Sequence, residues 1–311
     1  MRRLQLLINA ARRQTDNEDY DSSSGISDEE FIQYANDAQD DILAAIHLQF
    51  PMSLVKESTI TLINGQESYD LPSDIFLNSR LVNVEFAPTG NLREYYKLKE
   101  GTLSERFTGY SADPSFYIRR SGSILLQPTP KTGFARINYQ YNVPRLDIRL
   151  AKVGAVTLAT SSITSLTFDT SYTLKDDQIL EEEYFSVVSK DGVVKMQSIP
   201  ISSIDVSTGV VTIVAGFTFD TGETIAVGDY ICRGKYGTTH SQLPDICEQY
   251  IYKFLSWKIL KRDSSGDSRE QTEELLMTKN IIVESFKLPD GDVSYIPIID
   301  SSYLDDDTGF W

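Results

Sequence analysis

The chain has 311 residues, of which 41% are hydrophobic, and it carries a formal net charge of −16 at pH 7. This length exceeds a typical domain of roughly 100–150 residues, so we expect two domains or one domain with a large insert. The hydrophobic content excludes a fully disordered chain. The acidic charge disfavours a protein that grips nucleic acid, because such proteins normally carry a basic face. It suits either plain solubility or a surface past which DNA slides without sticking.

Two features bear on the compartment. The only cysteines are Cys232 and Cys247, which form neither a CxxC pair nor a disulfide framework. We therefore expect a reducing compartment, with both thiols as small buried apolar groups. The basic residues 1–13 lack the apolar stretch and the cleavage site of a secretory signal. Nor is there an apolar run of about 18 residues, so we expect no membrane span.

Helical periodicity occurs in residues 2–13, 28–48, 243–261 and 267–287. Ser27 opens the second segment with a capping box, in which its hydroxyl accepts from the N–H three residues later and a glutamate reaches back. Such helices are marginal in isolation, so we expect an antiparallel bundle that joins the two ends of the chain.

The apolar positions expected to face this bundle include a wide face on the third helix, which contains Ile246 and Tyr250. The last helix offers Leu275, Leu276, Ile281, Ile282 and Phe286.

Between the helices lie strand patterns. Alternation over residues 57–63 predicts a strand, and Asn64-Gly65 predicts a hairpin whose return strand is the stretch QESYDL. Further strands are predicted at SRLVNVEFA, FYIRR, SILLQPTP and ARINYQYNV, with a tight turn at Ser121-Gly122.

A corner follows the predicted return strand. Proline lacks an N–H donor and forces the preceding residue into an extended conformation, so strand pairing ends there. Ser73 and the aspartate after it then turn the chain. We interpret this corner as a marker of the fold without a catalytic role; its residues are Tyr69, Asp70, Leu71, Pro72 and Asp74.

Residues 150–233 change character. They are rich in Thr, Ser, Val and Ile, and turn residues recur at short intervals, which is typical of a small all-β barrel or sandwich. We predict an α+β protein with this domain inserted into a core. The core comprises residues 1–149 and the C-terminal helices at 234–288.

The last segment, residues 289–311, has no periodic pattern but is too apolar to be a solvating tail. We interpret it as an extended C-terminal arm that docks on a partner, although folding back onto its own subunit is the alternative. The arm residues predicted to bind are Tyr295, Ile296, Ile298, Ile299, Tyr303, Leu304, Phe310 and Trp311.

Signals for chemistry are weak. His47 and His240 each lack a second histidine nearby, and zinc sites usually need three or four ligands. The acidic runs at 176–183 and 305–307 lack the glycine-centred spacing of a calcium loop. No nucleophile elbow, phosphate loop or dinucleotide fingerprint occurs. We therefore predict neither an enzyme nor a cofactor or metal.

The order of motifs is more informative. A helix containing YANDAQDDILAAI precedes the β-segment that ends in Tyr-Asp-Leu-Pro. The strand-turn-strand YIRRSGSILLQPTP follows, and late helices begin at QLPDICEQYIYKFL. This order resembles the head-to-tail adaptor (connector) proteins of tailed bacteriophages. The resemblance covers residues 28–145 and 240–288 and leaves out 150–233.

The resemblance implies a structural protein of the virion at the head–tail interface, assembled in the host cytoplasm. Its expected partners are the portal protein, a tail or nozzle protein and further copies of itself. A twelve-fold ring would surround the channel, through which DNA passes at genome ejection without sequence-specific binding. Two alternatives remain open: a receptor- or glycan-binding virion protein that uses the β-insert, and a cell-wall hydrolase that uses its abundant carboxylates.

Overall fold

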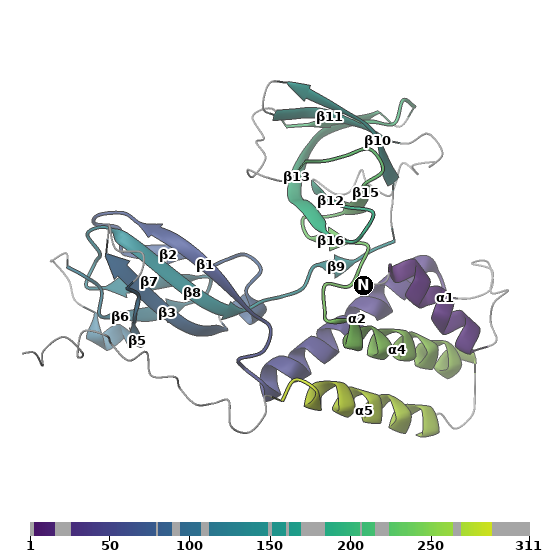
Figure 1. Cartoon of the computed structure of the whole chain (residues 1–311), viewed down its shortest axis with the longest axis horizontal. Helices are drawn as coiled ribbons and strands as arrows, with labels where there is room; N and C mark the ends of the chain where they lie inside the picture. The colour runs from purple at the N-terminus through teal and green to yellow at the C-terminus, as the bar shows by residue number, and fades with distance from the viewer. Residues whose placement is uncertain are drawn as a thin grey trace, which may run out of the picture.

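The computed structural model describes residues 3–15, 26–78, 80–88, 94–106, 112–148, 151–159, 162–168, 184–205, 207–214, 224–263 and 269–287. The fold is α+β, and Figure 1 shows its three parts: a group of helices, a pair of packed β-sheets and a closed β-barrel. The barrel confirms one of the two forms predicted for the Thr- and Val-rich segment.

Four helices are described. They are α1 (Leu4–Gln14), α2 (Asp28–Gln49), α4 (Asp245–Asp263) and α5 (Arg269–Glu284). Their bounds agree with the helical periodicity of the sequence to within a few residues. The predicted capping box is present: the Glu30 N–H donates to the Ser27 hydroxyl at 3.2 Å, and the Ser27 N–H donates to the Glu30 carboxylate at 2.9 Å. The box satisfies backbone donors that the first turn of α2 leaves without helical partners.

One apolar core joins the helices from both ends of the chain. Helix α4 packs against α1, α2 and α5, and Phe31, Ile42 and Leu255 are fully buried among these helices. Each buried side chain of this size stabilises the fold by about 1.5–3 kcal/mol. The N-terminal helices therefore depend on the segment that follows the barrel.

Three apolar residues expected in this core are exposed instead. Ile246 is 41% exposed, Leu276 is 55% exposed and Ile281 is 58% exposed. The buried face of α5 is set by Leu275 and Ile282. Successive helical residues are about 100° apart, so an apolar residue next to a buried one already lies at the edge of that face.

The β-segment forms a sandwich of two four-stranded sheets. Their orders are β1-β8-β3-β4 and β2-β7-β6-β5. The strands are β1 (Val55–Leu62), β2 (Ser68–Asp70), β3 (Leu81–Pro88), β4 (Tyr96–Lys97), β5 (Lys99–Glu100), β6 (Phe116–Arg120), β7 (Ser123–Gln127) and β8 (Gly133–Gln140). Phe86 of one sheet and Ile124 of the other are fully buried in the shared core. The predicted tight turn joins β6 to β7, with Gly122 at φ +76°.

The hairpin predicted at Asn64-Gly65 is wrong. The chain does turn there, with Gly65 at φ +81°. However, β1 pairs with β8 and β2 pairs with β7, so the turn carries the chain from one sheet to the other. Residues such as Leu62 and Tyr69 then face the same core from opposite sheets. A turn motif fixes the local reversal but does not determine which strands pair.

The barrel closes in the order β10-β11-β14-β13-β12-β15. Its strands are β10 (Ala151–Ala159), β11 (Ser162–Phe168), β12 (Tyr184–Val188), β13 (Val194–Asp205), β14 (Val210–Ile213) and β15 (Tyr230–Arg233). Val187, Ile199 and Ile231 fill its interior. Closure leaves no free sheet edge, which suits a β-domain that stands beside the rest of the molecule.

Replacing Ser27 by Ala should destabilise the helical region by about 1 kcal/mol, because the cap hydrogen bond is lost while the Glu30 N–H stays partly buried. Urea unfolding followed by helical circular dichroism measures this, since the barrel contributes little helical signal. The matched control is Ser202→Ala at an exposed position of β13. Equal stability of the two variants would contradict the cap's role.

Candidate functional site

The three parts of the fold meet at a short parallel strand pair, β9 (Arg145–Leu146) and β16 (Gly237–Thr238). Arg145 and Asp147 donate their N–H groups across this pair. The backbone N–H and carbonyl of Leu146, which lies between them, face α2 instead. Both groups form hydrogen bonds with the Asn36 side chain. The Asn36 amide donates to the Leu146 carbonyl at 2.9 Å, and the Leu146 N–H donates to Asn36 Oδ1 at 2.8 Å. The Asn36 side chain therefore satisfies the two backbone groups of Leu146 that a third strand would otherwise pair with.

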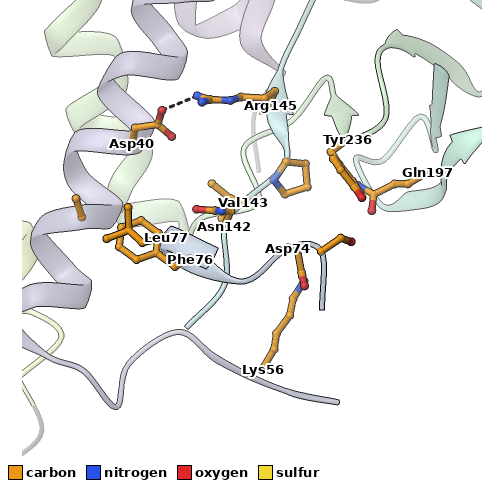
Figure 2. Close-up of a pocket in the computed structure, with 13 residues that line it drawn as sticks. Asp40, Lys56, Asp74, Phe76, Leu77, Asn142, Val143, Arg145, Gln197 and Tyr236 are labelled. Carbon is orange, nitrogen blue, oxygen red and sulfur yellow. Dashed lines mark hydrogen bonds and ion pairs between the residues drawn. The ribbon is translucent and has the colours of Figure 1, made fainter. Parts of the chain in front are cut away.

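About one turn further along α2, Gln39 adds a second contact between this helix and the connecting strand. It is fully buried, and its amide donates to the Pro144 carbonyl at 2.9 Å. Asp40 then forms an ion pair with Arg145, drawn as a dashed line in Figure 2. The connection between the sandwich and the barrel thus lies along α2 over several residues. This attachment fixes where the chain enters the barrel.

A charge cluster around the buried Asp147 ties the end of the barrel to the same helix. The Arg233 guanidinium lies 3.3 Å from Asp147 and 3.0 Å from Glu29 of α2. Burial raises the pKa of Asp147, and the adjacent Arg233 offsets only part of that effect. Removing Arg233 would leave a buried carboxylate without its cation, which costs far more than losing an exposed pair.

His240 fastens the barrel to the start of α1. Its ring packs on Gly192, where a Cβ atom would come within 2.6 Å of the imidazole, and its backbone bridges to Arg3. The Thr239 hydroxyl lies 2.9 Å from His240 Nδ1. Burial lowers the pKa of His240 to about 4, and Arg3 adds to the effect. The imidazole is therefore neutral near pH 7 and serves as a packing group.

The predicted corner lies beside this junction. Strand β2 ends at Asp70, and the Leu71 N–H donates to the Gly122 carbonyl at 2.9 Å. The Tyr69 hydroxyl accepts from the Ile63 N–H at 3.0 Å and so holds the crossing turn. Asp74 accepts from the Tyr139 hydroxyl and from Lys56, both at 2.8 Å. The corner therefore links the two sheets and supplies a carboxylate at the junction.

A cavity of about 560 Å³ opens where these elements meet. Figure 2 shows Phe76 and Leu77 on one side and Gln197 and Tyr236 of the barrel region on the other. Leu77 is 63% exposed and has φ +49°, a conformation that non-glycine residues adopt at a cost. An exposed, strained leucine at the edge of a cavity marks the junction as a candidate contact surface.

Three titratable side chains that could carry chemistry are buried. His47 is buried, its pKa is lowered by burial, and its Nε2 lies 3.1 Å from the Tyr141 carbonyl. Burial raises the pKa of both Cys232 and Cys247, so the thiols are protonated and packed as expected. Within the described ranges, no three His, Cys, Asp or Glu side chains are grouped as metal ligands would be. In the same residues, no helix has the length and apolar character needed to span a membrane.

The predicted arm, Tyr295 to Trp311, and the acidic runs at 176–183 and 305–307 lie outside the described residues.

Comparison with known proteins identifies a family to which the N-terminal part of the chain is similar. Residues 2–151 match the model of the SU10 adaptor protein family. This segment, slightly less than half of the chain, is similar to a family of phage head-to-tail adaptors, and we call it the adaptor segment. The match confirms the resemblance predicted from the order of motifs over residues 28–145. No curated protein matches the chain. The adaptor segment contains α1, α2, the sandwich and β9, and it ends at the first residue of the barrel.

Sequence reasoning missed the polar residues that hold this adaptor segment to the barrel. Asn36 and Gln39 lie three residues apart on α2, interleaved with the buried Ala35 and Ala38. Two uncharged amides on an otherwise apolar stripe are the signal that could have revealed a buried backbone contact. Their partner strand could not have been identified, because it lies more than a hundred positions away.

Replacing Asn36 by Ala should lower the free energy of unfolding by about 2–4 kcal/mol, because two buried backbone groups of Leu146 lose their partners. Chemical unfolding measures the loss. The matched control, Asn9→Ala, changes an exposed asparagine on α1 and should cost little. A loss no larger than the control's would show that Asn36 does not hold the junction.

Acid should weaken the His240 contact. The folded state disfavours the charged imidazole, so stability is lost as pH falls from the unfolded pKa of about 6.5 towards the folded pKa of about 4. Between about pH 7.5 and pH 5, His240→Asn should lose about 1–2 kcal/mol less stability than the unmodified chain. Urea unfolding at the two pH values tests this. An identical loss in both proteins would contradict the assignment.

Proposed function

We propose that the chain is a structural virion protein of a tailed phage, a head-to-tail adaptor that forms a ring between the portal and the tail. The observation that carries the proposal is the match of residues 2–151 to the SU10 adaptor family. That family consists of structural adaptors and not of enzymes. DNA passes through the channel of the ring during ejection, and a tail or nozzle protein binds on the far side from the portal.

We further propose that the barrel is a domain, residues 150–233, inserted into an adaptor core of residues 1–149 and 234–288. Support comes from the end of the family match at residue 151 and from the packing of α4 on α1 and α2. The helices on both sides of the insert bury one core, so the insert interrupts a single unit. In the ring, the four helices would act as the antiparallel bundle expected from the sequence.

Assembly into a ring is supported by the exposed face of α5. Met277 is 65% exposed and Ile281 is 58% exposed, and they lie one turn apart on the helix. Exposing such side chains in a finished virion protein is unfavourable, so a neighbouring copy is the proposed partner of this face. A repeated head-to-tail contact that closes on itself gives a cyclic ring, which we propose to be twelve-fold.

The arm at residues 289–311 is the proposed contact with the portal. Its apolar residues Tyr295, Ile296, Ile298 and Ile299 would gain burial energy on a partner surface. Weak arm contacts add together in a ring, because each arm binds while its neighbours hold the two partners in place. The cavity edge at Leu77 is a second surface available to a partner on the ring.

The test mixes the purified chain with the portal protein of the same phage and images the product by electron microscopy. We expect twelve-fold rings seated on the portal. A chain truncated before Tyr295 should keep its helical circular dichroism and its unfolding midpoint but no longer bind the portal.

The outcomes separate the claims. A full-length chain that neither forms rings nor binds the portal would overturn the adaptor function, and binding of glycans by the barrel would then favour receptor recognition. If the truncated chain binds the portal normally, the arm is not the contact, although the adaptor function stands.

A further inference from the structure

A cluster of aromatic and basic side chains on α4 and α2, which the junction does not use, forms a second candidate site. Trp257 and Phe254 lie with ring centroids 5.5 Å apart. The Lys258 ammonium is 4.7 Å from the Tyr34 ring and 5.4 Å from the Trp257 ring, and the Lys261 ammonium is 4.7 Å from the Trp257 ring. We call these five residues the lysine–aromatic platform.

The charges of the platform are not balanced by carboxylates. Nearby cations on the same helices have acidic partners: Lys253 pairs with Glu274, and Arg262 pairs with Glu30. Lys258 and Lys261 contact ring faces and form no ion pair within the part of the chain that the structure describes. Acidic residues outnumber basic ones by 45 to 29 in this chain, so two neighbouring ammonium groups without a carboxylate indicate a site for an external acidic group.

The chain itself contains a segment of matching chemistry. Residues 303–311 read YLDDDTGFW, with three consecutive aspartates between aromatic residues. Carboxylates can pair with the two ammonium groups while the aromatic rings pack against the platform. The whole segment 288–311 contains six aspartates and neither Lys nor Arg, so its charge is opposite to that of the platform throughout.

The reach of the chain favours docking within one molecule. The Trp257 indole donates to Thr272 at 3.1 Å, so α5 starts beside the platform and runs back along α4. From Thr272 to Lys287 the helix and its last turn advance about 22 Å. A random-coil chain of fifteen residues, the number between Lys287 and Tyr303, has a typical end-to-end distance of about 19–23 Å. A linker whose length matches its span gives the highest effective concentration.

We propose that in the unassembled chain the acidic aromatic segment 303–311 docks on the lysine–aromatic platform of the same molecule. This goes beyond the adaptor function, because it assigns the arm a resting site before any partner is met. The contact is electrostatic and partly exposed, so it is weak enough to be replaced by a larger apolar surface. A partner would then bind the arm only by displacing it from α4.

The test exploits the two tryptophans of the chain, Trp257 on the platform and Trp311 at the far end. In protein labelled with 5-fluorotryptophan, each gives one fluorine resonance, assigned with Trp311→Phe. Replacing Asp305, Asp306 and Asp307 by Asn should shift the Trp257 resonance. The matched control replaces Asp290, Asp292 and Asp300 by Asn, removes the same charge outside the docking segment, and should leave that resonance in place.

The reciprocal change is read at the other tryptophan. Lys258→Glu with Lys261→Glu should move the Trp311 resonance to the position seen at about 0.5 M salt, where exposed ion pairs are screened. The control, Lys97→Glu with Lys99→Glu, inverts two exposed lysines on the sandwich and should have no effect.

Two results would overturn the proposal. If the aspartate and lysine variants leave both resonances unchanged, the segment does not dock on the platform. If the shifts depend on protein concentration under conditions where light scattering detects association, the platform is occupied by a second copy. Neither result bears on portal binding by the assembled ring, so failure here is distinguishable from failure of the adaptor function.

Discussion

The pairing of the Asn36 side chain with the backbone of Leu146 is the interaction on which the rest of the arrangement depends. The strand that connects the sandwich to the barrel is only two residues long and has one strand neighbour. Its other edge would be left without partners inside the protein, which is costly for backbone groups. The Asn36 amide supplies both a donor and an acceptor at this edge. It thereby fixes the position of the strand at which the helices, the sandwich and the barrel meet.

Ion pairs also hold the junction together, although the chain as a whole is strongly acidic. Arg233 lies between a buried aspartate and a glutamate on α2, and Arg145 pairs with Asp40 of the same helix. The few cations near the junction are thus placed between elements that are distant in sequence. The pair with the buried Asp147 adds little net stability but penalises any arrangement that separates the partners, whereas the more exposed pairs with Glu29 and Asp40 contribute little energy. Their contribution is to the geometry of the junction.

The sequence was informative wherever local physics decides the structure. The cap at Ser27 and the turn at Gly122 follow from interactions within a few residues, and the burial of both cysteines follows from the apolar character of the thiol. Strand pairing was not predictable in the same way, because β1 finds its partner in β8, far along the chain, and the turn at Gly65 crosses between sheets. The contacts at the junction were not predictable for the same reason. The hydrogen-bond partners of Asn36 and Gln39 are backbone groups of residues 144–146, which lie more than a hundred positions away.

The way in which the barrel is attached has a consequence for how such a protein can change. Ala151 at the start of the barrel is paired with Ile231 near its end, so the chain leaves and returns at neighbouring positions of one ladder. Seen from the helices and the sandwich, the whole barrel is equivalent to a long loop with fixed ends. Its size and surface can be altered, or the domain exchanged for another, without moving the residues on either side. The surface of the barrel can therefore diversify while the residues on either side keep their positions.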